Sequence, residues 1–108
     1  MKERIVPYQV EGNLLIYVMP KELDHHTAEK LCKELDMLVA AHQIKELILD
    51  FKETEFMDSS GVGIMIGRSK TMRFYDGHLY VKNMGKRVEG IFRAAGLYKM
   101  IKIIIINF

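Results

Sequence analysis

The sequence predicts an α/β domain with a mixed β-sheet and helices packed mainly on one face of that sheet. Two short apolar segments flank a three-residue turn, which indicates an antiparallel hairpin. Three apolar stripes with helical spacing then alternate with short apolar runs, as expected of parallel strands joined by helices. The predicted order is ββαβαβαβ, and because such crossovers are right-handed, the helices should share a face.

The first two strands are expected over residues 5–10 and 14–19, joined by the turn-forming Glu11-Gly12-Asn13. Asp24 is then well placed to cap a helix of about four turns. This helix is indicated by apolar residues that recur at intervals of three and one: Ala28, Leu31, Cys32, Leu35, Leu38 and Val39.

The next strand is expected over residues 45–51, where Leu47-Ile48-Leu49 forms the continuous apolar run typical of a covered parallel strand. We expect it to be central. Asp76-Gly77 should end the second helix before a strand at residues 78–81. The stripe of that helix consists of Val62, Met65, Ile66, Ser69 and Met72.

Gly96, with Leu97 behind it, has the pattern of a left-handed cap that closes the third helix. The last strand is expected over residues 102–108 and includes four consecutive isoleucines at 103–106, which must be covered or paired. The stripe of the third helix consists of Val88, Ile91, Phe92 and Ala95.

Length and composition predict one domain over residues 1–108. With 49% apolar and 28% charged residues, the chain resembles an ordinary globular domain. No apolar stretch approaches the roughly 18 residues that span a bilayer, and the amino terminus lacks the pattern of a signal peptide. The single cysteine, Cys32, falls on the buried side of a predicted helix and is expected to be a small core residue. We therefore expect a cytoplasmic protein with no membrane partner.

The charged and histidine residues do not indicate a nucleic-acid or metal site. Residues 1–67 carry 7 basic and 12 acidic side chains, and residues 68–108 carry 9 and 2, an asymmetry that can guide a charged partner. His25 and His26 are adjacent on a predicted helix and point about 100° apart, so no metal is expected. The basic side chains that nucleic-acid binding would need have no interleaved aromatic platform and are expected on solvated helix faces: Arg68, Lys70, Arg73, Arg87 and Arg93.

The segment Phe56-Met57-Asp58-Ser59-Ser60-Gly61-Val62-Gly63 places two hydroxyls and a carboxylate where a helix is expected to begin. Asp and Ser are good N-cap residues, and a phosphoryl group on a serine there would face free backbone N–H groups. The glycine spacing differs from the dinucleotide-binding fingerprint, and neither serine lies in G-x-S-x-G. The pattern therefore favours neither a Rossmann site nor a serine hydrolase.

This segment, together with Glu22-Leu23-Asp24-His25-His26-Thr27-Ala28, resembles the bacterial anti-sigma factor antagonists of the STAS domain family, particularly the anti-sigma F factor antagonists of sporulation. A third matching stretch, Ile91-Phe92 with Ala95-Gly96-Leu97 and Lys99, extends the resemblance over most of the chain. Two features depart from the family pattern. Pro20-Lys21 stand where a glycine is common, and the sequence stops at Phe108, where the family usually continues into a helix.

The resemblance implies a single STAS-like domain that is a ligand and substrate rather than an enzyme, with no cofactor. In that family the unphosphorylated antagonist binds an anti-sigma factor that is also a serine kinase and so frees a sigma factor; phosphorylation ends this binding. The family's phosphoacceptor corresponds to Ser59, and a dedicated phosphatase reverses the modification. The partner-binding residues that match are Asp24, Asp58, Ser60 and Gly61.

Two alternatives stay open at this point. The predicted helix start at Ser59 would also suit a module that binds a free phosphate or nucleotide. A STAS domain could instead serve general stress signalling or a membrane-associated complex. Within the family, the stretch Asp24-His25-His26-Thr27-Ala28 favours sporulation.

Overall fold

A computed structural model of the chain describes residues 6–105. Ile5 and residues 106–108, which were predicted to belong to the first and last strands, lie outside the described residues. The elements, in chain order, are β1 (Tyr8–Glu11), β2 (Leu14–Val18), β3 (Glu22–Leu23), α1 (His25–Ala41), β4 (Glu46–Asp50), β5 (Phe56–Met57), α2 (Ser59–Phe74), β6 (His78–Lys82), α3 (Lys86–Ala94), the 3-10 helix η1 (Leu97–Lys99) and β7 (Lys102–Ile104).

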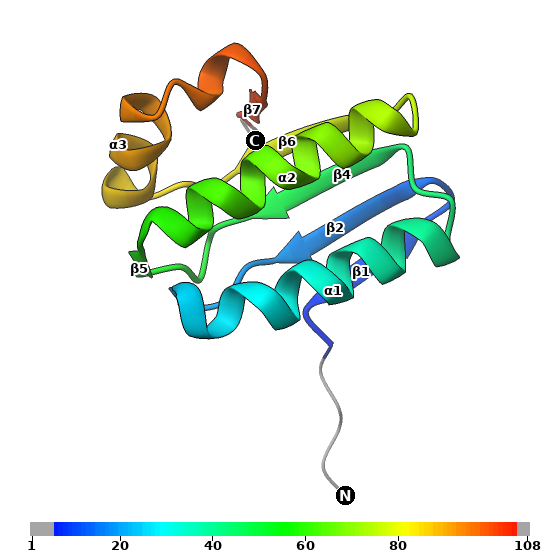
Figure 1. The fold of residues 1–108 in the computed structure, drawn as a ribbon, viewed down its shortest axis with the longest axis horizontal. Helices are drawn as coiled ribbons and strands as arrows, with labels where there is room; N and C mark the ends of the chain where they lie inside the picture. Colours follow the sequence, from blue (N-terminus) through cyan, green and yellow to red (C-terminus); the bar gives the residue numbers. More distant parts are fainter. Residues whose placement is uncertain (1–5, 106–108) are drawn as a thin grey trace, which may run out of the picture.

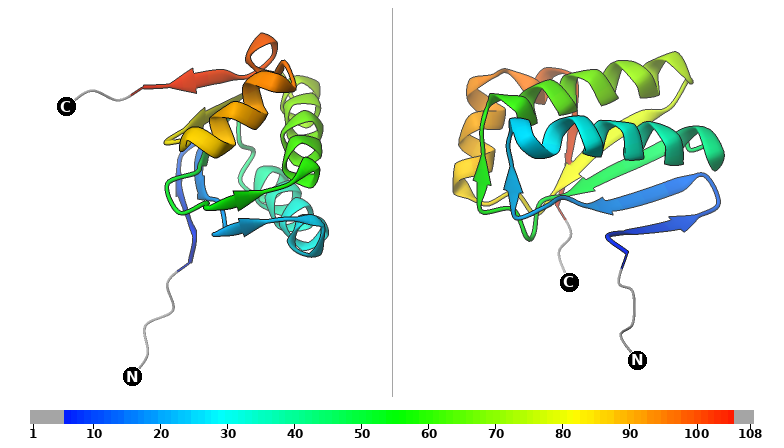
Figure 2. Two further views of the ribbon diagram at one scale, coloured as in Figure 1. Left: turned by 90° about the vertical axis from the view of Figure 1, so that its left-hand side faces the viewer. Right: turned by 60° about the horizontal axis from the view of Figure 1, so that its bottom comes forward.

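The main sheet has five strands in the order β1-β2-β4-β6-β7. β1 and β2 pair antiparallel, and every later pair is parallel. Since each new parallel strand is added on the same side, right-handed crossovers bring successive helices to one face. Figures 1 and 2 show α1 and α2 side by side over that face. The predicted mixed sheet, with helices mainly on one side, is confirmed.

A second sheet was not predicted. It consists of β3 and β5, two residues each, paired parallel with Glu22 opposite Phe56 and Leu23 opposite Met57. Figure 2 shows the two short strands lying apart from the main sheet, each leading directly into the first turn of a helix. Sequence periodicity cannot detect strands of two residues, because alternation needs about four positions to be visible.

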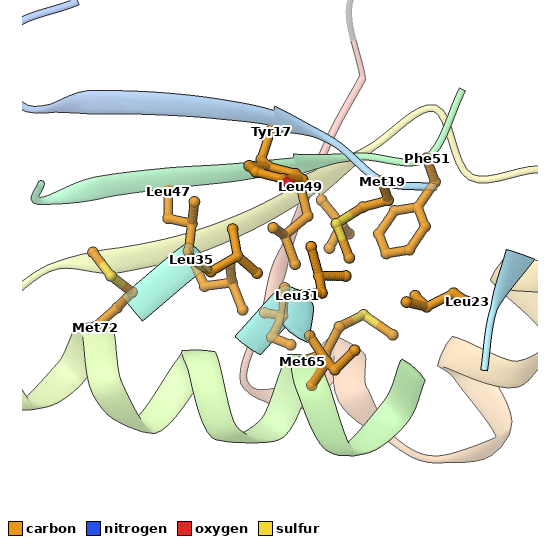
Figure 3. Close-up of a cluster of buried hydrophobic side chains, with 14 of the residues drawn as sticks. Tyr17, Met19, Leu23, Leu31, Leu35, Leu47, Leu49, Phe51, Met65 and Met72 are labelled. Carbon is orange, nitrogen blue, oxygen red and sulfur yellow. The ribbon is translucent and has the colours of Figure 1, made fainter. Parts of the chain in front are cut away.

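The core lies between the main sheet and the pair α1 and α2, where side chains from both layers interdigitate (Figure 3). In β2 and β4 alternate residues point toward the helices, and Leu15, Leu47 and Leu49 are fully buried. The predicted stripes are confirmed for most positions, but Ile64 was missed, Cys32 is only half-buried, and Ala95 is an exposed residue at the C-cap of α3. The isoleucines of the last strand were expected to be covered or paired, but Ile105 is exposed.

Helix boundaries follow their predicted signals. Asp24 is the N-cap of α1, and α2 ends just before Asp76-Gly77. A methyl group on Gly77 would collide with the backbone carbonyl of Lys45, so the chain can make this close approach only at glycine. Gly96 has φ of 72°, and Leu97 behind it is buried, as a left-handed cap with an apolar follower requires.

The charge asymmetry maps onto the order of the strands. β1, β2 and β4 come from the acid-rich part of the chain, whereas β6, β7 and α3 come from the basic part. The prediction for Arg68 was wrong. Its side chain is 13% exposed and its Nε lies 3.0 Å from Asp36 Oδ1, so it pairs with an α1 carboxylate rather than solvent.

Asp50, at the carboxyl end of β4, is 3% exposed. Its Oδ1 accepts hydrogen bonds from Lys52 N at 3.0 Å and from Asn83 Nδ2 at 3.0 Å, and its Oδ2 lies 4.0 Å from Lys82 Nζ. A buried carboxylate is tolerated only with such partners. Asp50 therefore ties the loop after β4 to the loop after β6.

We expect Asp50→Ala to lower the free energy of unfolding by about 2 to 3 kcal/mol, because it removes the acceptor of two hydrogen bonds to a charged group. Glu53→Ala, an exposed change three residues away, is the control and should stay within about 0.5 kcal/mol of the unaltered protein. Urea denaturation monitored by circular dichroism measures both. Equal stability of the two variants would contradict a structural role for Asp50.

Candidate functional site

The second sheet brings two helix starts together. β3 leads directly into α1 and β5 leads directly into α2, so the parallel pairing of the strands places the two N-cap residues, Asp24 and Asp58, side by side. The backbone N–H of Asp58 donates to the carbonyl of Leu23 at 3.2 Å, which continues the pairing to the cap itself. Two motifs that are 34 positions apart in sequence thus form one site.

Asp24 forms a complete capping box at the start of α1. Its Oδ1 accepts from the backbone N–H groups of His26 at 2.9 Å and Thr27 at 3.2 Å, and Thr27 Oγ1 accepts from the Asp24 N–H at 3.2 Å. Such a box satisfies backbone donors at both ends of the first turn. The Asp24 carboxylate is therefore held in a fixed position at the edge of the site.

Asp58 caps α2 in a similar way. Its Oδ1 accepts from the Ser60 N–H at 2.7 Å, and its carbonyl accepts from the Gly61 N–H at 3.0 Å. The hydrogen bond from Ser60 is the main cause of a lowered pKa at Asp58, and His25 adds to it. Because the folded state lowers this pKa, the stabilisation is present at neutral pH and is lost as pH falls through the lowered value.

Ser59 is the first residue of α2 and is exposed, whereas Ser60 is half-buried beside it. Within residues 6–105, no hydrogen bond joins the Ser59 hydroxyl to a base that could activate it. The same part of the chain gathers no group of three or more metal-ligating side chains. Ser59 is therefore an accessible hydroxyl at the start of α2.

His25 was missed as a site residue. Its Nδ1 lies 3.9 Å from Asp58 Oδ2, and its ring centroid lies 4.0 Å from that of His26. His25 was expected only to begin a helix, which it does, but its position in α1 also lets it reach the cap of α2. Its place directly after the first cap aspartate is the sequence signal that could have indicated this contact.

Gly61 is buried where α2 passes over β5 and β3. A methyl group there would collide with the side chain of Met57 and would lie 3.2 Å from Leu23 Cδ2. The missing side chain thus lets the first turn of α2 pack directly on both short strands. The structure gives Gly61 a packing role, and its role in partner binding stays a prediction.

A model of the STAS domain family matches residues 5–105. The chain belongs to the STAS domain family. It is 32% identical to the anti-sigma F factor antagonist of Paenibacillus polymyxa over 90 residues, which are 83% of this chain and 77% of that protein. It is also 32% identical to the anti-sigma-B factor antagonist of Listeria monocytogenes over 85 residues, 76% of this chain and 71% of that protein.

Solved structures give the same result for the fold of this STAS domain. The anti-sigma factor antagonist SpoIIAA in its unphosphorylated form is similar with a TM-score of 0.79 and 26% identity, over 91% of this chain and 88% of that one. The Bacillus SpoIIAA in its phosphorylated form is similar with a TM-score of 0.71 and 25% identity, over 91% of each chain. The family resemblance and the fold class predicted from the sequence are therefore confirmed.

Within residues 6–105 of this STAS domain, every helix is too short or too polar to cross a membrane.

The structure brings all five predicted site residues to one end of the molecule: Asp24, Asp58, Ser59, Ser60 and Gly61.

We expect Gly61→Ala to lower the free energy of unfolding by about 1 to 3 kcal/mol, because the added methyl group displaces Met57 from a packed position. Gly63→Ala is the matched control, since nothing lies within 4 Å of the added group there. Alanine in an open helical position should stabilise the protein by about 0.5 to 1 kcal/mol. Thermal and urea unfolding of the pair measures the difference; stabilisation by both changes would contradict the packing role of Gly61.

Proposed function

We propose that this STAS domain is a cytoplasmic anti-sigma factor antagonist that is switched by phosphorylation of Ser59. Its unphosphorylated form binds an anti-sigma factor that is also a serine kinase, and so releases a sigma factor. The observation that carries the proposal is the exposed Ser59 at the start of α2, beside the two aspartates that cap α1 and α2. The relatives of the chain include anti-sigma factor antagonists. A protein phosphatase restores the binding form.

The chemistry of the switch lies in the added charge. A phosphoryl group on Ser59 carries about −1.5 to −2 charges next to the Asp58 carboxylate. Inside the folded chain, the free N–H groups and the positive end of α2 offset part of the repulsion, so the fold should tolerate the modification. The antagonist is then altered at its surface while its core stays intact.

A partner that covers Ser59 does not supply N–H groups that offset the added charge. Its surface would have to desolvate a dianion beside a carboxylate, and a loss of about 3 kcal/mol in binding free energy lowers affinity more than a hundredfold. Ser59 needs no activating base of its own, because the kinase supplies the base and the nucleotide-bound metal. The protein is therefore a substrate and a ligand in this scheme, not an enzyme.

Sporulation is the process that we propose for this antagonist. The relatives include an anti-sigma F factor antagonist and an anti-sigma-B factor antagonist, so overall similarity supports either process. The first motif, with His25 and His26 directly after the cap aspartate, favours the sporulation branch. In this structure, His25 also lies 3.9 Å from the second cap aspartate, so one of these two histidines is next to the proposed binding site.

We expect one phosphate to be added to the protein by its anti-sigma kinase and ATP, and none to be added to Ser59→Ala. Ser60→Ala is the control and should gain one phosphate, because it keeps the exposed Ser59. Ser60 itself is half-buried beside the Asp58 cap. Intact-mass spectrometry after incubation measures all three proteins. Normal phosphate incorporation into Ser59→Ala would move the acceptor elsewhere, and no incorporation into the unaltered protein would contradict the proposed switch.

A further inference from the structure

We propose that Phe56 and Arg87 form a second contact area for the anti-sigma factor, close to Ser59, which binds an acidic side chain of that partner; this inference rests on the proposed function. The area joins an exposed aromatic ring in β5 to a cation in the first turn of α3. The Ser59 site carries two carboxylates, so the Phe56–Arg87 area would give the binding surface a neighbouring region of opposite charge.

Phe56 is 41% exposed although it lies two positions before the Asp58 cap. Its neighbour Met57 is buried, because the two residues of β5 point to opposite sides. The core uses only the Met57 side. A large aromatic side chain left partly in solvent at the edge of a binding site is a feature of interface anchors.

Arg87 covers one part of that ring, with its Cζ 5.9 Å from the ring centroid. An arginine in this cation–π position is held in place while its N–H donors stay available for a carboxylate. Within residues 6–105, neither Arg87 nor its neighbour Lys86 has a carboxylate within 4.0 Å. By contrast, Arg93 on the same helix is paired with Glu89 at 3.7 Å.

The position of these cations does not serve the stability of α3. Lys86 and Arg87 occupy its first turn, where the helix dipole disfavours positive charge, and Glu89, the acidic residue of that turn, pairs with Arg93 instead. Figure 1 shows the first turn of α3, β5 and the start of α2 together at one end of the molecule. The unpaired cations therefore lie at the end that carries Ser59.

An acidic side chain on the partner would complete this arrangement. Its carboxylate would pair with the Arg87 guanidinium, and the apolar atoms around it would cover Phe56. Truncating or reversing one member of such a charge pair weakens a complex through both lost attraction and an uncompensated charge. The contact area would add specificity for one anti-sigma factor without involving the phosphorylated residue.

Isothermal titration with the anti-sigma factor kinase, loaded with ADP so that no phosphate is transferred, tests the inference. We expect Arg87→Glu to weaken binding by about tenfold or more and Phe56→Ala by about fivefold, with a smaller effect of Arg87→Glu at high salt. Lys99→Glu, the same charge change at an exposed position in η1, is the control and should stay within about twofold.

Thermal unfolding of each variant is the control for folding, and we expect all of them to remain folded because the substituted positions are exposed. If the unaltered protein binds and is phosphorylated but Arg87→Glu binds as well as Lys99→Glu, the inference is overturned and the proposed function stands. If the unaltered protein does not bind the anti-sigma factor, both are overturned.

Discussion

The parallel pairing of β3 with β5 is the constraint on which the candidate functional surface depends. Only two residues of each strand take part, yet each strand runs directly into a helix. The pairing therefore fixes the two helix starts relative to one another, together with both cap aspartates. Gly61 allows this close packing because a side chain there would collide with Met57. The main sheet and its core supply the rigid support beneath, and the site itself is built from helix termini and short strands.

This arrangement would separate the stability of the fold from the proposed switching. The carboxylates of Asp24 and Asp58 are occupied by backbone N–H groups, whereas the Ser59 hydroxyl points to no internal partner within the described residues. A charge added at Ser59 would therefore change the surface that a partner contacts without removing a contact that stabilises the fold. His25, which reaches from α1 to the cap of α2, adds an electrostatic link between the two motifs.

The sequence was sufficient to predict the five strands of the main sheet, the three helices and the caps at Asp24 and Gly96, because these elements have apolar patterns or clear terminal signals. It could not predict β3 and β5, whose two-residue lengths leave no pattern. Arg68 was placed on a solvated face because spacing alone does not show that a carboxylate of another helix lies opposite. The five site residues came from the family resemblance, and their spatial union, with His25 added, depended on the unpredicted second sheet.

Hydrogen–deuterium exchange of the protein with and without its anti-sigma factor would show whether the two distant motifs form one binding surface because β3 and β5 pair. We expect simultaneous protection of residues 22–27 and 56–62 in the complex, and loss of that protection when Ser59 is phosphorylated. Protection confined to one of the two segments, or centred on residues 76–78 at the opposite ends of the strands, would contradict it.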